Sequence, residues 1–155
     1  MKRNHLIEII SSLLVLLFVY TAFSKLLDYT AFKVQLGKSP FINAFAGTVA
    51  WALPAGEFLV ALALAFRKTR LSGLYASLFL MTMFTAYIYV MLQYSYYIPC
   101  SCGGVLSNLT WIQHLWFNGV FVLISVTGIL LQSKQYTIPE TAEEKLPPVV
   151  YSAIS

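Results

Sequence analysis

Charged residues are scarce in this sequence. Lys, Arg, Asp and Glu make up 10% of the 155 residues, whereas hydrophobic residues make up 59%, and the mean hydropathy is +0.74. A soluble domain carries about 25% charged residues. The chain therefore lacks the charge to cover a folded domain with a water-soluble surface. Its length leaves room for one domain, and the composition predicts that this domain lies in a membrane.

A basic stripe is also missing. The formal net charge of +4 and the isoelectric point near 9.1 are values that nucleic-acid-binding proteins can share. Here, however, the basic residues stand at the ends of apolar runs, as Arg67, Lys68 and Arg70 do. That placement is typical of membrane flanks. It excludes a nucleic-acid partner and favours membrane lipid.

Four apolar runs dominate what is present. Each is long enough to cross about 30 Å of hydrocarbon at about 1.5 Å per residue. We expect an all-α membrane protein, a four-transmembrane-helix bundle within a domain of residues 1–131, with helices at about 6–27, 41–66, 71–93 and 111–131. Residues 132–155 are polar and contain three prolines, which predicts a weakly ordered C-terminal tail.

Small and aromatic residues indicate how these helices sit. Three pairs of small residues stand four apart, which allows close helix contact in lipid: Ala46 with Ala50, Ala52 with Gly56, and Gly73 with Ser77. The outer ends of the last two helices are rich in aromatic residues, which we interpret as an interfacial belt. These residues are Tyr87, Tyr89, Tyr94, Tyr96, Tyr97, Trp111 and Trp116.

The distribution of Lys and Arg predicts the orientation. With a cytoplasmic N-terminus, the cytoplasmic side holds most of the basic residues, which favours cytoplasmic N- and C-termini. That side has Lys2, Arg3, Arg67, Lys68, Arg70, Lys134 and Lys145, against Lys25, Lys33 and Lys38 on the other. Residues 94–110, which contain no Lys, Arg, Asp or Glu, then face outward. In a bacterial inner membrane this loop faces the oxidising periplasm.

The first apolar run has a second interpretation. Ala22-Phe23-Ser24 follows a basic start and an apolar run, as a small-x-small signal-peptide cleavage site does. The run is longer than a usual signal core, contains Glu8, and leads into Lys25-Leu26-Leu27-Asp28, which is typical of a helix end. These features favour an uncleaved helix.

Cysteine occurs only twice, as Cys100 and Cys102 in the outward loop. A disulfide needs Cα atoms about 4.4–6.8 Å apart, and Pro99 and Gly103-Gly104 are residue types that permit the tight turn required. So small a ring gains little from chain entropy. Strained, exposed disulfides are exchangeable, so a redox pair is the preferred interpretation.

Two alternatives stay open for this loop. The disulfide can be static and simply shape the loop. Alternatively, Cys100, Cys102 and His114 can offer two thiolates and an imidazole to Cu(I) or Zn. His114 itself can be a base that takes a thiol proton near a helix N-terminus, or a polar anchor bonded to a loop carbonyl.

Glu57 is an acidic residue deep within an apolar run, three residues after Pro54. Such a residue is a functional-site hypothesis by default. It can carry a proton or make a polar contact inside the bundle, and in its protonated form it can help to satisfy a carbonyl group freed by the proline. Lys25, at the outer end of the first helix, is long enough to reach the membrane surface. Asn118 is expected to bridge helices rather than to bind a ligand.

Four short motifs resemble those of the MauE/DoxX family of redox-associated membrane proteins. Their order and spacing cover the chain from the first helix to the fourth. They are Phe23-Ser24-Lys25-Leu26-Leu27-Asp28, Pro54-Ala55-Gly56-Glu57, Cys100-Ser101-Cys102-Gly103-Gly104 and Trp111-Ile112-Gln113-His114.

The resemblance implies a four-helix inner-membrane bundle that works with periplasmic thioredoxin-like proteins. MauE is associated with maturation of a disulfide-rich periplasmic enzyme subunit, and DoxX relatives with thiol or sulfur redox at the quinone level. Residue by residue, the resemblance implies that Cys100 and Cys102 are the redox pair. Lys25, Glu57 and His114 are motif positions without an assigned role.

We therefore predict a membrane component of thiol–disulfide exchange, a candidate thiol–disulfide oxidoreductase that reacts through a mixed disulfide with its partner or a disulfide-containing client. Two cysteines and no haem motif provide no second thiol pair to relay electrons across the membrane. Either a quinone meets the bundle near its outer surface, or a partner protein both delivers and removes the electrons.

Two other classes compete with this interpretation. The chain can be a non-enzymatic membrane assembly or maturation subunit whose Cys-Ser-Cys loop is structural. A small-solute transporter ranks last, because the chain is short, has few polar groups in its apolar runs and shows no inverted repeat.

Overall fold

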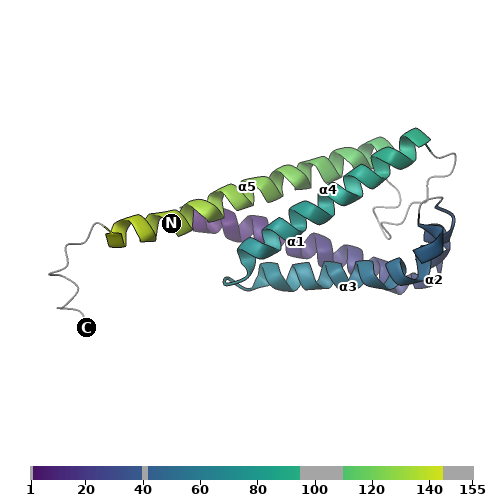
Figure 1. Cartoon of the computed structure of the whole chain (residues 1–155), viewed down its shortest axis with the longest axis horizontal. Helices are drawn as coiled ribbons and strands as arrows, with labels where there is room; N and C mark the ends of the chain where they lie inside the picture. The colour runs from purple at the N-terminus through teal and green to yellow at the C-terminus, as the bar shows by residue number, and fades with distance from the viewer. Residues whose placement is uncertain (1, 40–41, 95–109, 145–155) are drawn as a thin grey trace.

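The computed structural model describes residues 2–39, 42–94 and 110–144, and all regular structure in them is helical (Figure 1). The elements are α1 (Lys2–Leu27), α2 (Tyr29–Gly37), the 3-10 helix η1 (Asn43–Phe45), α3 (Ala46–Ala65), α4 (Arg70–Tyr94) and α5 (Trp111–Glu144). Four helical segments are long and apolar enough to cross a membrane: Asn4–Leu27, Asn43–Ala65, Arg70–Tyr94 and Ile112–Ser133. The predicted all-α, four-span membrane fold is confirmed.

The helices differ from the predicted runs at their ends. α2 was not predicted, because its nine residues form no long apolar run. In the structure, Phe32 and Leu36 are its buried residues. α5 continues to Glu144, although its apolar part ends at Ser133. A helix needs backbone hydrogen bonds rather than apolar side chains to continue past a membrane span, so hydropathy does not mark its end.

The four long helices pack in a ring. α1 contacts α3 and α5, and α4 contacts the same two helices, so α1 and α4 lie diagonally opposite. Figure 1 shows the N-terminus, the α3–α4 turn and the C-terminal part of α5 toward one end of the bundle. α2, η1, the end of α4 and the start of α5 lie at the other end, which we name the α2 end.

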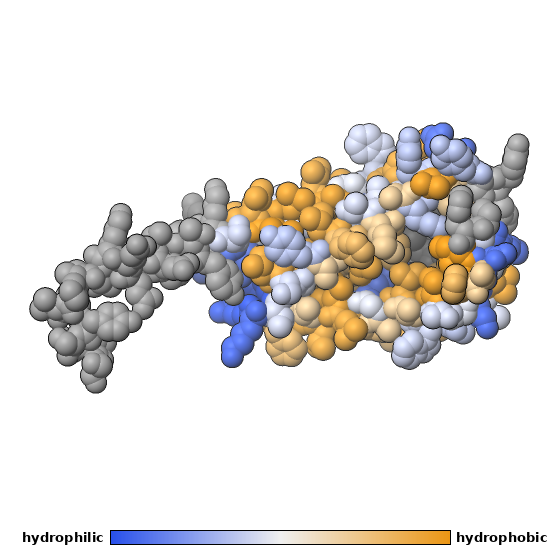
Figure 2. Space-filling model, in the orientation of Figure 1, coloured by the Kyte–Doolittle hydropathy of each residue, from blue (hydrophilic) through white to orange (hydrophobic). Residues whose placement is uncertain are grey.

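Two buried clusters form the interior. The larger, between α1, α3, α4 and α5, comprises Leu14, Phe18, Val60, Ala61, Leu64, Leu74, Met81 and Ile129. The smaller, where α2 meets α3, comprises Phe32, Leu36, Ala46 and Ala50. Large apolar side chains such as Leu16, Trp51, Phe79 and Leu123 are exposed, and apolar residues cover much of the visible surface of the bundle in Figure 2. Such a surface suits lipid contact.

The turn between α3 and α4 is closed by polar residues. Thr69 Oγ1 donates to the carbonyl of Ala63 at 2.9 Å, and Arg70 Nε donates to that of Leu64 at 3.4 Å. These bonds satisfy carbonyl groups that the last turn of a helix leaves without an intrahelical partner. Arg67 also reaches α1, where its Nη2 lies 2.8 Å from Glu8 Oε1.

Gly73 lets α4 approach α3 closely just after this turn. A Cβ atom at Gly73 would lie 2.8 Å from the backbone nitrogen of Leu64, and Gly73 and Ser77 are both buried. The predicted contact at Gly73 and Ser77 is therefore correct. The Ala52–Gly56 prediction is wrong, because Ala52 is exposed and a Cβ atom at Gly56 would meet nothing within 4 Å.

Candidate functional site

Lys25 and Glu57 form an ion pair inside the bundle. Lys25 Nζ, in the last turn of α1, lies 2.6 Å from Glu57 Oε1 in α3, and their side chains are 5% and 1% exposed. Charges at such depth in a membrane protein are costly unless they are paired. The pairing explains how a helix as apolar as α3 accommodates a glutamate.

Two aromatic rings complete the surroundings of the ammonium group. Lys25 Nζ lies 6.0 Å from the ring centroid of Phe32 in α2 and 5.7 Å from that of Phe84 in α4. Both distances fall within the range of a cation–π interaction. The lysine is thus held by groups from α2, α3 and α4, although it belongs to α1.

This arrangement corrects the expectation for Lys25 and agrees with one alternative for Glu57, a polar contact inside the bundle. Lys25 does not extend to the membrane surface, because its ammonium turns inward to Glu57. Glu57 accepts a hydrogen bond from Lys25, and none of its hydrogen bonds among the described residues goes to a carbonyl group near Pro54. α3 runs unbroken through Pro54.

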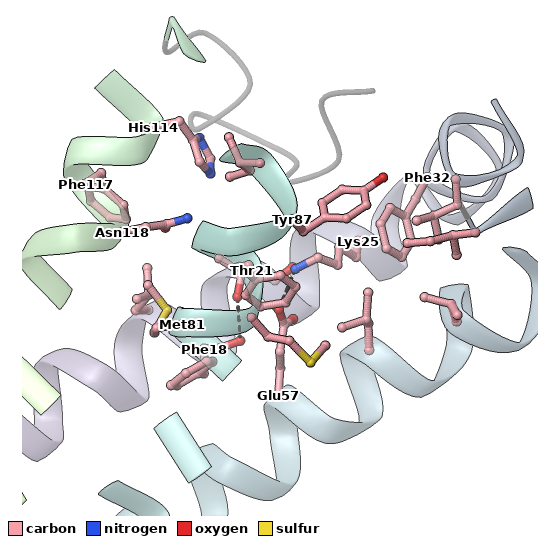
Figure 3. A pocket seen from close by; sticks show the side chains of 18 of the residues that line it. Phe18, Thr21, Lys25, Phe32, Glu57, Met81, Tyr87, His114, Phe117 and Asn118 are labelled. Carbon is pink, nitrogen blue, oxygen red and sulfur yellow. Dashed lines mark hydrogen bonds and ion pairs between the residues drawn. The ribbon is translucent and has the colours of Figure 1, made fainter. Parts of the chain in front are cut away.

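A cavity of about 470 Å³ opens beside the ion pair (Figure 3). It lies between the two buried clusters, with Phe18 and Met81 of the larger one and Phe32 and Leu36 of the smaller one in its wall. Most of the lining is apolar. The polar side chains in it are Thr21, Lys25, Glu57, Tyr87, His114 and Asn118.

His114 reaches this cavity from the first turn of α5, and its side chain is buried. A capping box fixes where that helix begins. The Thr110 backbone N–H donates to Gln113 Oε1 at 3.0 Å, and the Gln113 N–H donates to Thr110 Oγ1 at 3.4 Å. Such reciprocal bonds satisfy the free donors of a helix N-terminus. The sequence carried this signal as Thr-x-x-Gln just before an apolar run, and it was missed.

Asn118, one turn after His114, also lines the cavity and is 5% exposed. The expectation that it bridges helices is wrong for its amide nitrogen, because Nδ2 has no hydrogen-bond partner among the described residues. In Figure 3 its side chain points toward the interior, facing the side on which Lys25 and Glu57 lie. Glu57 Oε2 is likewise without a partner in that part of the chain.

Tyr87 was expected in the interfacial belt but is part of the cavity wall. Its hydroxyl lies 3.0 Å from Ser39 Oγ, which in turn lies 3.9 Å from Met91 Sδ. These contacts tie the segment after α2 to α4. Tyr89, Tyr94 and Trp116 are exposed, as a belt requires. No pattern in the sequence separates Tyr87 from them, because its partner is distant along the chain.

The predicted redox pair, Cys100 and Cys102, lies outside the described residues, as does most of the connection between α4 and α5. Among the residues that are described, no three His, Cys, Asp or Glu side chains gather as a metal site would require. The alternative of a metal held by His114 with both cysteines depends on the connection and stays a prediction.

The site thus unites three of the four sequence motifs. Lys25, Glu57 and His114 come from the ends or middle of different helices and line one cavity. Comparison with known protein families gives one match: the family described as methylamine utilisation protein MauE, over residues 3–131. The chain belongs to this family. No curated protein and no solved structure matches it.

The family match covers every residue that lines the cavity. It begins near the start of α1 and ends close to the end of the fourth candidate membrane span at Ser133. The remaining part of α5, which the match does not include, lies beyond the apolar span.

Proposed function

We propose that this MauE-family chain is a membrane component of thiol–disulfide exchange, with Cys100 and Cys102 as its redox pair and a periplasmic thioredoxin-like protein as its partner. One observation carries the proposal. Lys25, Glu57 and His114, from three separate motifs, converge on one cavity, and His114 belongs to the first turn of α5, which begins at the α2 end of the bundle (Figure 1). The Cys-Ser-Cys sequence belongs to the segment that joins the end of α4 to the start of α5.

The exchange follows ordinary thiol–disulfide chemistry. A thiolate of the pair attacks the partner's disulfide, so one partner thiolate leaves and a mixed disulfide forms. The second cysteine then attacks this bond, which closes the Cys100–Cys102 disulfide and releases the partner as a dithiol. The pair loses two electrons and the partner gains them. The reverse sequence oxidises a partner dithiol.

Family membership and the likeness to DoxX proteins support this role. The family's description points to methylamine utilisation, and a maturation step for a disulfide-containing client is the place we assign to the exchange. The low charge of residues 94–110 suits a connection that meets both the membrane surface and a partner.

We place the chain in the bacterial inner membrane with both termini cytoplasmic and the cysteines facing the periplasm. Arg67 and Lys68 lie in the turn between α3 and α4, at the end of the bundle opposite the α2 end, and basic residues favour the cytoplasmic side. Residues 1–131 form the transmembrane domain in this proposal, and residues 132–155 form a polar cytoplasmic extension.

Cysteine trapping tests the exchange step. Cys100→Ser and Cys102→Ser each leave one thiol that can form a mixed disulfide but has no second thiol in the chain to resolve it. At least one variant is expected to accumulate a covalent adduct with a thioredoxin-like protein that disappears on reduction. The Cys100→Ser/Cys102→Ser double variant is the control and should give none.

Three outcomes would count against the proposal. The first is that neither single variant forms an adduct under any redox condition. The second is that the double variant retains partner binding and client maturation, which would make the chain a non-enzymatic assembly subunit. A midpoint potential of the pair far below about −300 mV would also indicate a structural bond.

A further inference from the structure

The cavity beside the Lys25–Glu57 pair has the size of a small-molecule site. Its volume of about 470 Å³ falls in the range of about 300–1,000 Å³ that ligand pockets occupy. A mainly apolar wall with a few convergent polar groups is also the usual composition of such sites. The size and lining together indicate a ligand rather than a packing defect.

The surroundings of the cavity restrict the ligand to a lipid-soluble compound. The lining residues from α1, α3, α4 and α5 belong to segments that can span the membrane. Two residues of the cavity wall, Phe45 of η1 and Met83 of α4, are 67% and 48% exposed. The cavity therefore extends from a buried polar end to side chains that face lipid, and a compound dissolved in the bilayer can enter from the side.

The polar groups require a ligand with oxygen atoms. Asn118 Nδ2 and Glu57 Oε2 are buried without hydrogen-bond partners among the described residues. A buried polar group left unsatisfied costs about 1–3 kcal/mol. An acyl chain would leave both groups in that state, whereas a ring that carries carbonyl groups would accept hydrogen bonds from the amide of Asn118 and from the Lys25 ammonium.

The placement of these groups favours a quinone. Asn118 of α5 and Lys25 of α1 face the cavity from different sides (Figure 3), as the two carbonyl groups on opposite edges of a quinone ring require. A hydroquinone donates O–H bonds instead, and Glu57 Oε2 is an acceptor with no competing partner in the described structure. The site thus offers a donor for one redox form and an acceptor for the other. Phe18, Phe32, Phe84 and Phe117 supply aromatic surface for contact with the ring.

We propose that this cavity is a binding site for a lipid-soluble quinone, with Asn118 donating to one ring oxygen and Lys25 to the other. The binding of quinone does not depend on the proposed function, whereas electron transfer to the bound quinone rests on it. In that reaction the dithiol loses two protons and two electrons, an S–S bond replaces two S–H bonds, and the quinone becomes a hydroquinone with two new O–H bonds.

The test is a titration of the full chain, held in lipid nanodiscs, with decyl-substituted benzoquinone. Calorimetry measures the binding. The Cys100→Ser/Cys102→Ser background prevents any reaction, so the result does not depend on the exchange chemistry. We expect saturable binding, and a dissociation constant at least tenfold higher for Asn118→Leu, because the loss of one buried hydrogen bond is worth about a factor of ten. Asn43→Leu is the matched control, because Asn43 is exposed and outside the cavity wall.

A second variant and a second ligand keep the proposal open to refutation. Met83→Trp fills the lipid-facing rim without touching the polar groups, and it should weaken binding at least tenfold while the thermal unfolding midpoint stays close to that of the parent. Decylbenzene has the same chain without ring oxygens and should bind at least tenfold more weakly than the quinone. Absence of saturable quinone binding would overturn the proposal. So would equal affinity for decylbenzene, or unchanged affinity in both the Asn118→Leu and Met83→Trp variants.

Discussion

Lys25 and Glu57 lie 32 residues apart in the chain, yet their side chains meet at 2.6 Å in the interior of the bundle. The bond joins α1 to α3 beside the cavity. Because both groups are almost fully buried, each charge depends on the other to be tolerated. The ion pair consequently has a structural role as well as a place in the candidate site, and its energetics can be measured separately from any activity.

Removal of one member of this pair should destabilise the protein strongly. Lys25→Met and Glu57→Leu each leave one buried group without its partner, which costs about 3–5 kcal/mol for buried pairs. The double variant should be more stable than either single variant, because it leaves no unpaired charge. Unfolding measured in detergent checks this double-mutant cycle. Additive effects of the two substitutions would contradict the pairing.

The ion pair between Arg67 and Glu8 offers a contrast. Its atoms are 2.8 Å apart, but the side chains are 82% and 41% exposed. Exposed pairs contribute about 0–1 kcal/mol because water and salt screen them. Arg67→Gln should therefore change the free energy of unfolding by less than about 1 kcal/mol. A loss as large as that of Lys25→Met would show that this pair is shielded from water.

Gly73→Ala should weaken the contact between α3 and α4. The added methyl group would lie 2.8 Å from Leu64 N and 3.0 Å from a carbon of the Ala63 backbone, so a helix must shift. Overpacking of this kind costs about 1–3 kcal/mol. The unfolding midpoint of Gly73→Ala should fall.

Gly119→Ala is the matched control for Gly73→Ala. A Cβ atom at Gly119 meets nothing within 4 Å, and alanine is the better helix former. Its unfolding midpoint should stay the same or rise. Equal losses in the two variants would mean that helix propensity, and not the close approach, governs Gly73.

Thr110→Ala should loosen the start of α5. The substitution removes the hydroxyl that accepts the Gln113 N–H, and the loss of a helix N-cap costs about 0.5–2 kcal/mol. Amide hydrogen exchange should increase in the first turn, around His114, more than in the rest of α5.

Thr127→Ala provides the comparison within the same helix. The Thr127 hydroxyl is exposed and donates to the Leu123 carbonyl one turn earlier, far from the start of α5, so its loss should leave exchange near His114 unchanged. The role assigned to the cap would be wrong if both variants affected the first turn equally.

Two features that were not predicted, the cap of α5 and the helix α2, have recognisable patterns in the sequence. The Thr110–Gln113 cap follows a known spacing, and the Phe32–Leu36 pair of α2 stands one helical turn apart. A search for long apolar runs overlooks both, because each signal occupies only a few residues. The roles of Lys25, Tyr87 and Asn118 were different. Each was assigned from its position within one helix, whereas its surroundings are supplied by other helices.

The amino-acid sequence by itself determined the membrane fold and the four spans, because hydrophobic length is a local property that the bilayer selects directly. Only the tertiary structure decided which polar residues meet. The pairing of Lys25 with Glu57, and the gathering of His114 and Asn118 around the same cavity, depend on the rotation of each helix and on the order in which the helices pack. Those features arise from contacts between residues far apart in the chain, and no single apolar run contains them.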